Sequence, residues 1–171
     1  MASCYKTFIS VGNAKQHFSR LLNVIESLVD QLPRPILIQA GHTPINSKHC
    51  DVVDFIAMDT FTQYMHDAEL LILHAGAGSL LHAIKANKFP IVVPRRASFN
   101  EHVNDHQFAF AKMLDLEGRA FCVEDPNDLA TAIQILQQKK SLAKEQYPSR
   151  AMDVIDHLLI NLFAKTSKQT G

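Results

Sequence analysis

The chain lacks the features that mark a nucleic-acid-binding, secreted or membrane-spanning protein. Basic and acidic residues both total 17, so the formal net charge is zero, and no basic run offers nucleic acid a patch. The three cysteines form neither a CxxC pair nor a disulfide framework, which favours a reducing, cytoplasmic setting. No stretch approaches the roughly 20 apolar residues of a membrane span. The N-terminus does not follow the pattern of a signal peptide.

What is present is the composition of an ordinary globular domain. Hydrophobic residues make up 47% of the 171 residues and charged residues 20%. This length suffices for one proper hydrophobic core. We therefore expect a single domain over residues 1–164, followed by a polar C-terminal tail at 165–171.

Predicted strands and helices alternate along the chain. Short apolar runs predict strands at 7–11, 36–39, 55–58, 70–73, 90–94 and 121–123. Apolar residues at helical spacing predict helices over 18–29, 60–66, 80–86, 105–117, 129–136 and 152–163. The polar segment 45–54 predicts neither. This alternation indicates an α/β fold, a Rossmann-like parallel sheet with helices on both faces.

The central stretch of the chain, His74 to Ser79, reads as a strand, a glycine turn and the start of a helix. Glycines let the backbone approach a ligand, and the first amides of a helix are unpaired donors, so such a turn can seat a phosphate. Any tight turn between strand and helix would use the same small residues, and both interpretations stay open. The residue pattern at 74–79 matches neither a dinucleotide-binding fingerprint, nor a Walker loop, nor a nucleophile elbow. A hydrolase that uses Ser79 and His106 ranks last among the functions considered.

Three turns should converge beyond the carboxyl ends of the strands, where ligands of such sheets bind. They are Gly12–Asn13, the 74–79 turn and the polar segment 94–107. In the last of these, His102 and His106 stand four residues apart, but no third ligand is spaced to complete a metal site, so none is predicted. The segment is either a solvated surface loop or a loop that reads a sugar or phosphate.

Several motifs together resemble the C-terminal domain of glycosyltransferase family 28. They are HAGAGS at 74–79, the proline-bracketed strand at 90–94 and NEHVNDHQ at 100–107, with FISVG at 8–12, FSRL at 18–21 and IQAGH at 38–42. The resemblance extends from Lys6 to about Leu136. It is greatest to the small single-domain members that serve as subunits of exopolysaccharide and dolichol-linked glycosyltransferases.

The resemblance implies the C-terminal, donor-binding half of a GT-B glycosyltransferase, with a UDP-sugar as donor. The glycine turns would contact the diphosphate, and His106 and Gln107 the transferred sugar. His82 stands where relatives commonly carry an acid that binds the ribose hydroxyls. Asn13 replaces a frequent threonine, and Asn104 a frequent aspartate. The implied donor site comprises Gly12, Asn13, His74, Gly76, Ala77, Gly78, Ser79, His82, Asp105, His106 and Gln107.

The function so implied is the donor-binding, catalytic subunit of a two-subunit glycosyltransferase. It would move a sugar, an N-acetylhexosamine or a hexose or uronic acid, from a UDP-sugar to a lipid-linked acceptor, without a cofactor. Its partner would be a membrane-anchored, acceptor-binding subunit that recruits it to the cytoplasmic face of a membrane. The predicted helix at 152–163 either docks that partner or packs on its own domain. The alternative is a non-catalytic, nucleotide-sugar-binding regulatory module.

The sequence assigns no general base. His17 and His74 lie near predicted strand ends and are candidates. A packing or hydrogen-bonding role is favoured for each.

Overall fold

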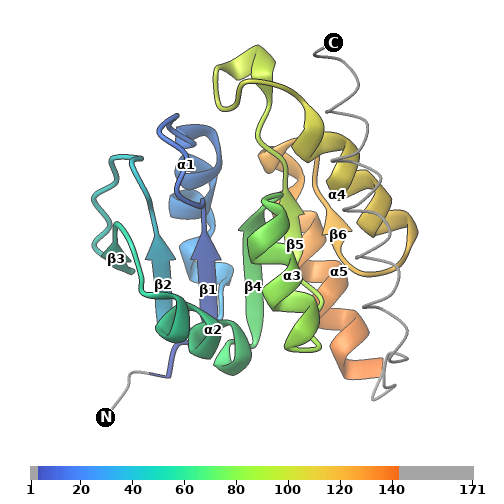
Figure 1. The fold of residues 1–171 in the computed structure, drawn as a ribbon. Coiled ribbons are helices and arrows are strands. Elements are labelled where there is room, and N and C mark those ends of the chain that lie inside the picture. Colours follow the sequence, from blue (N-terminus) through green and yellow to red (C-terminus); the bar gives the residue numbers. More distant parts are fainter. Residues whose placement is uncertain (1–3, 143–171) are drawn as a thin grey trace.

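A computed structural model describes residues 4–142, which form a six-stranded, all-parallel sheet (Figure 1). The strand order is β3-β2-β1-β4-β5-β6, with β1 and β4 paired at the centre. This order reverses beside β1, and parallel sheets bind ligands at such a reversal. The strands are β1 Thr7–Ser10, β2 Ile36–Gln39, β3 Asp51–Val53, β4 Leu70–His74, β5 Ile91–Val93 and β6 Phe121–Cys122.

Helices cover both faces of the sheet, as the alternation of elements predicted. Helices α1 and α5 pack on one face, behind the sheet in Figure 1, and α2, α3 and α4 on the other. The α-helices are α1 Ser19–Leu28, α2 Met58–Asp67, α3 Ala77–Lys85, α4 His106–Leu116 and α5 Leu129–Leu142. Three short 3-10 turns are η1 Val29–Gln31, η2 Ala97–Phe99 and η3 Pro126–Asp128.

The central strands are buried on both faces because neighbouring side chains point to opposite sides of the sheet. In β1, Ile9 joins the core beneath α1 and α5, while Phe8 joins the core beneath α2, α3 and α4. In β4, Ile72 and Leu71 divide in the same way. The two-sided burial explains why these strands read as continuous apolar runs.

The third strand is the one element that the sequence misplaced. The predicted strand at 55–58 is wrong: β3 spans Asp51–Val53, inside the segment for which no element was predicted. This edge strand has only three residues, two of them exposed, so it shows no long apolar run, and Asp51 accepts a hydrogen bond from the Tyr5 hydroxyl at 2.8 Å. Phe55 and Met58 are exposed and lead into α2.

Two other expectations concern residues at the end of the chain. The predicted helix at 152–163 and the tail at 165–171 lie outside the described residues, so the single-domain boundary stays a prediction. Within residues 4–142, no helix is both long and apolar enough to cross a bilayer.

The two-sided core gives a stability prediction. Ile72 is fully buried in the central strand, so Ile72→Ala should lower the free energy of unfolding by about 2–5 kcal/mol. The matched control is Leu116→Ala at the exposed end of α4, which should change it by less than about 0.5 kcal/mol. Urea denaturation of both variants provides the measurement. Equal losses would contradict the assignment of Ile72 to the core.

Candidate functional site

A pocket of about 250 Å³ lies at the carboxyl ends of β1, β2 and β4. It gathers the turns after β1 and β4, the residues around the start of α2 and the first turn of α3. Its lining residues are Ser10, Gly12, Asn13, Gln39, Ile56, Met58, Phe61, His74, Gly76, Gly78, Ser79 and His82. Seven residues of the expected donor site therefore share one pocket: Gly12, Asn13, His74, Gly76, Gly78, Ser79 and His82.

The two glycine turns close around the imidazole of His74. The ring lies so near Gly12 and Gly76 that a Cβ atom at either position would overlap it. Gly12 also has a φ of +77°, which other residues rarely adopt. Close packing against His74 therefore requires glycine at both positions, whether or not a ligand binds.

His74 is a buried, neutral histidine. Burial, followed by the positive charge of Arg95, lowers the pKa of its imidazole from 6.5 to about 4. Its Nδ1 lies 3.4 Å from the carbonyl oxygen of Ser10, so the neutral ring donates its Nδ1 proton there. A histidine with so low a pKa is a weak general base, and its geometry fits a positioning role.

The first turn of α3 supplies backbone donors to the pocket. Gly76 precedes the helix with extended torsions, and the helix begins at Ala77. The first amides of an α-helix have no acceptor within the helix and attract anions. A Cβ atom at Gly78 would meet no other atom within 4 Å, so the backbone there is open to a ligand. Ala77 does not line the pocket and packs against the core beneath α2, α3 and α4.

The opposite wall of the pocket is apolar, with Ile56, Met58 and Phe61 at the entry to α2. His82 lies beside this wall: its ring packs edge-on to Phe61, and its Nδ1 is 3.4 Å from the hydroxyl of Thr62. A flat, partly apolar ligand group fits between such side chains.

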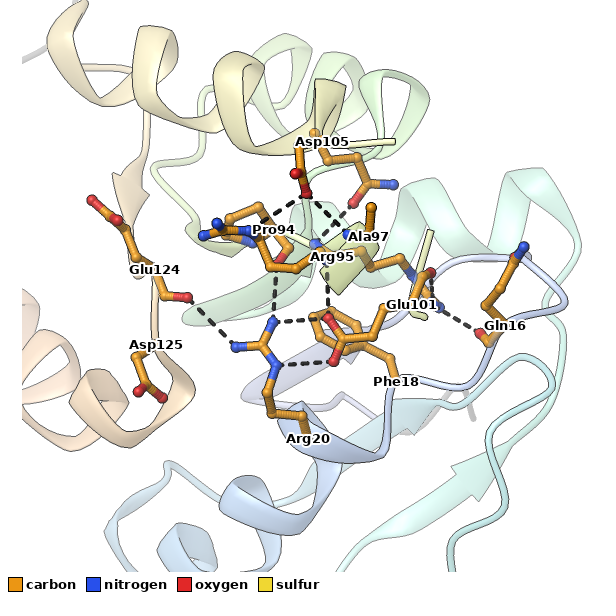
Figure 2. A network of polar contacts seen from close by, with 12 residues as sticks. Gln16, Phe18, Arg20, Pro94, Arg95, Ala97, Glu101, Asp105, Glu124 and Asp125 are labelled. Carbon is orange, nitrogen blue, oxygen red and sulfur yellow. Dashed lines mark hydrogen bonds and ion pairs between the residues drawn. The ribbon is translucent and has the colours of Figure 1, made fainter. Parts of the chain in front are cut away.

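The loop after β5 is anchored from within by Arg95, whose side chain is fully buried (Figure 2). Its guanidinium donates to the carbonyl oxygens of Val11 (2.7 Å), Gln16 (2.8 Å) and Glu101 (3.1 Å). The ring of Phe18 stacks 4.8 Å from the guanidinium carbon. Burial lowers the pKa of Arg95 from its usual value to about 10, so the group remains charged at neutral pH.

A second arginine holds the same loop through the buried carboxylate of Glu101 (Figure 2). Arg20 of α1 donates to both of its oxygens, at 2.9 and 2.8 Å, and the backbone amide of Arg96 donates to Oε2 at 3.0 Å. The loop is therefore anchored at Arg95 and Glu101 by charges that lie inside the protein, while Phe99 and Val103 remain exposed at its surface.

The last three expected site residues follow this loop and do not line the pocket. Asp105 precedes α4 but does not cap it with its side chain: Oδ1 accepts from the amide of Ala97 at 2.9 Å. Asp105 is thus the N-cap residue of α4 by position only, and Asn104 Oδ1 accepts from the amide of His106 at 3.2 Å. Gln107 Oε1 accepts from the amide of Arg95 at 3.2 Å.

Metal ligands do not gather anywhere in residues 4–142: no three His, Cys, Asp or Glu side chains lie close enough to hold an ion. His102 turns its Nδ1 toward the backbone of Asn104. Of the two other histidines considered as a base or ligand, His17 is exposed and His106 is exposed at the start of α4.

Comparison with known families identifies the domain. The model of the glycosyltransferase family 28 C-terminal domain matches residues 8–158. The chain belongs to this family. The sequence is similar to that of the UDP-N-acetylglucosamine transferase subunit ALG13 of Mus musculus. The two are 33% identical over 106 residues, which cover 58% of this chain and 8% of the mouse protein.

Solved glycosyltransferase structures share the fold of this family 28 domain. The kitacinnamycin glycotransferase superimposes with a TM-score of 0.57 at 15% identity, over 78% of this chain and 35% of its own. MurG of Acinetobacter baumannii gives a TM-score of 0.56 at 23% identity, over 80% and 42%. The chain thus spans less than half of each relative. These likenesses confirm the expected fold, which corresponds to one half of a GT-B glycosyltransferase.

Sequence reasoning missed several polar residues of this family 28 domain's carboxyl edge. Arg20, Arg95 and Glu101 carry the loop, and Ser10 and Gln39 lie beneath the Gly12–Asn13 turn. The only available signal was a charged residue directly after a proline-bracketed strand, at Arg95. A charged side chain in a loop is usually exposed, so the sequence alone does not reveal that Arg95 is buried.

The carboxylate that joins α1 to the loop gives a second prediction. Glu101→Gln replaces an acceptor oxygen by an amino group that faces donors, so the free energy of unfolding should fall by roughly 2–4 kcal/mol. Amide hydrogen exchange over residues 95–105 should accelerate at the same time. Glu117→Gln, at an exposed position, is the control and should match the wild type. A Glu101→Gln protein as stable as this control would refute the anchoring role.

The lowered pKa of His74 predicts a pH dependence of stability. The unfolded state takes up a proton below about pH 6.5, whereas the folded state does so only near pH 4, so stability is full above pH 6.5 and falls as the pH drops toward 4. The loss should reach about 3 kcal/mol. Urea denaturation at steps from pH 7 to 4 should show a flatter profile for His74→Gln, with exposed His49→Gln as control. Parallel profiles for His74→Gln and the wild type would contradict a neutral buried imidazole.

Proposed function

We propose that the chain is the donor-binding subunit of a two-subunit glycosyltransferase that uses a UDP-sugar. The observation that carries the proposal is the pocket at the strand ends, where a helix N-terminus and two glycine turns face an apolar wall. A nucleoside diphosphate has a matching division into a flat base and an anionic diphosphate. The base and ribose would lie against Phe61 and His82, and the diphosphate at the first turn of α3.

In this arrangement the protein contributes positioned dipoles to the reaction. As the bond between the sugar and the diphosphate breaks, negative charge grows on the leaving diphosphate. The amides at Gly78 and Ser79 would stabilise that charge without reorganising, which is the usual form of electrostatic catalysis. The anchored loop that leads to His106 and Gln107 would hold the transferred sugar, although these two side chains do not line the present pocket.

The comparisons with known glycosyltransferases support a partner subunit. The mouse relative is itself named a transferase subunit, and the solved neighbours are more than twice as long as the matched region. We propose that the partner binds a lipid-linked acceptor, is anchored in a membrane and holds this chain at the cytoplasmic face. The sugar would be an N-acetylhexosamine, hexose or uronic acid.

A second candidate is a regulatory module that binds the nucleotide sugar without turnover. The replacement of the family's usual acid by His82 favours it, because an imidazole cannot accept two ribose hydroxyls as a carboxylate does. A transfer assay with the co-expressed partner separates the two candidates. Release of UDP that depends on the acceptor supports catalysis, and binding without release supports regulation.

The donor site is tested by thermal unfolding of the full chain with UDP, GDP, AMP and NAD. A ligand that binds only the folded state stabilises it by about 2.7 kcal/mol at a hundredfold excess over its Kd. UDP should raise the Tm, and Gly78→Val should abolish the rise, because its side chain fills open space in the pocket.

Two further variants control this experiment. Gly78→Ala stabilises a helix by up to about 1 kcal/mol, so a weaker UDP response in this variant would not reflect unfolding. Lys85→Val places the same valine side chain at the exposed end of α3 and should respond to UDP like the wild type. Stabilisation of the wild type by another nucleotide alone would contradict the choice of UDP.

A further inference from the structure

A small buried network lies beneath the Gly12–Asn13 turn. Ser10 ends β1 and Gln39 ends β2, and both are almost wholly buried. The amide of Gly12 donates to Ser10 Oγ at 3.3 Å, and this hydroxyl lies 2.6 Å from Gln39 Oε1. Because the hydroxyl oxygen already accepts from Gly12, its single proton is given to Gln39.

These contacts leave the Gln39 amide only one orientation. Its Oε1 accepts from Ser10, and its Nε2 faces the carbonyl oxygens of Gly12 at 3.2 Å and Asp54 at 2.8 Å. A flipped amide would place its oxygen against two carbonyl oxygens, which offer no proton. Gln39 thereby joins the end of β1 to the segment that follows β3.

The fixed orientation of Gln39 extends to Asn13. Gln39 Nε2 lies 3.4 Å from Asn13 Oδ1, and its two N–H groups are shared among this oxygen and the carbonyl oxygens of Gly12 and Asp54. Since Nε2 can only donate, the Asn13 amide turns its oxygen toward Gln39 and its Nδ2 away from it. Asn13 is exposed and lines the pocket, so this Nδ2, with two N–H donors, is the end that a ligand meets.

We propose that Gln39 is a positioning residue that sets Asn13 as a hydrogen-bond donor to an anionic oxygen of the bound diphosphate. This inference rests on the proposed function, which places the diphosphate between Asn13 and the first turn of α3. Gln39 lies behind the turn and acts through Asn13. An asparagine without this constraint would present its oxygen as readily as its amino group, and an oxygen repels a phosphate.

A double-mutant cycle on the full chain tests the proposal, with calorimetric titration of UDP and of uridine, which lacks the diphosphate. Asn13→Ala should weaken UDP binding about tenfold, the effect of one hydrogen bond to a charged group, and Gln39→Met should weaken it at least about twofold, because Asn13 then presents its oxygen as readily as its amino group. Uridine binding should change less than twofold. The double variant should bind UDP no more weakly than Asn13→Ala alone, because the two residues act in series. Gln134→Met, on the exposed side of α5, is the control for the substitution.

The outcomes separate the proposal from the function on which it rests. A wild-type chain that binds no UDP overturns the proposed function itself. Independent losses that multiply in the double variant, or equal losses for uridine and UDP, overturn the positioning role alone.

If Gln39→Met does not fold, Asn13→Asp decides the question. Its carboxylate still accepts from Gln39, but it presents an oxygen to the pocket where Asn13 presents Nδ2. UDP binding should weaken more than tenfold while the Tm and uridine binding are kept. Unchanged UDP binding by Asn13→Asp would overturn the proposal.

Discussion

The buried guanidinium of Arg95 fixes the arrangement of the sheet's carboxyl edge. Removing such a cation from water is costly unless its N–H groups find acceptors. Nη1 and Nη2 of Arg95 find them in the carbonyls of Val11, Gln16 and Glu101, with the ring of Phe18 against the guanidinium face, while Nε has no acceptor among the described residues. These acceptors belong to the end of β1, the segment before α1 and the loop after β5. Movement of any one would leave a buried donor unpaired, so the three segments hold their places together.

The same cation acts on the pocket through its charge. It adds to burial in lowering the pKa of His74, and so helps to keep a neutral imidazole between Gly12 and Gly76. A neutral ring can donate from Nδ1 to Ser10 and pack closely against two glycine turns. The positions of both turns therefore depend on a residue that touches neither of them. The packing and the polarity of the pocket therefore depend on Arg95, in the loop after β5.

The sequence predicted those elements whose signal is local. The apolar run at 70–73 reflects the cover of β4 on both faces, and the glycine turn after it lines the pocket. The short edge strand Asp51–Val53 has no such run, since one of its sides has no neighbouring strand. Arg20 and Glu101 lie 81 residues apart, and no local pattern shows that they meet. A charged loop residue is usually exposed, so burial of Glu101 runs against the average. The prediction of a UDP-sugar as ligand came from the family resemblance and not from the periodicity.

The residues that line the described pocket include no lysine or arginine. Arg20 and Arg95 direct their guanidinium groups at protein acceptors, which makes them part of the scaffold. An anion in this pocket would therefore meet backbone amides at the start of α3 and the amide of Asn13. Such dipoles are fixed before the ligand arrives, and each depends on a neighbour: the α3 turn on His74, and Asn13 on Gln39. A diphosphate in this pocket would thus depend for its binding on dipoles that the buried polar network beneath the pocket orients.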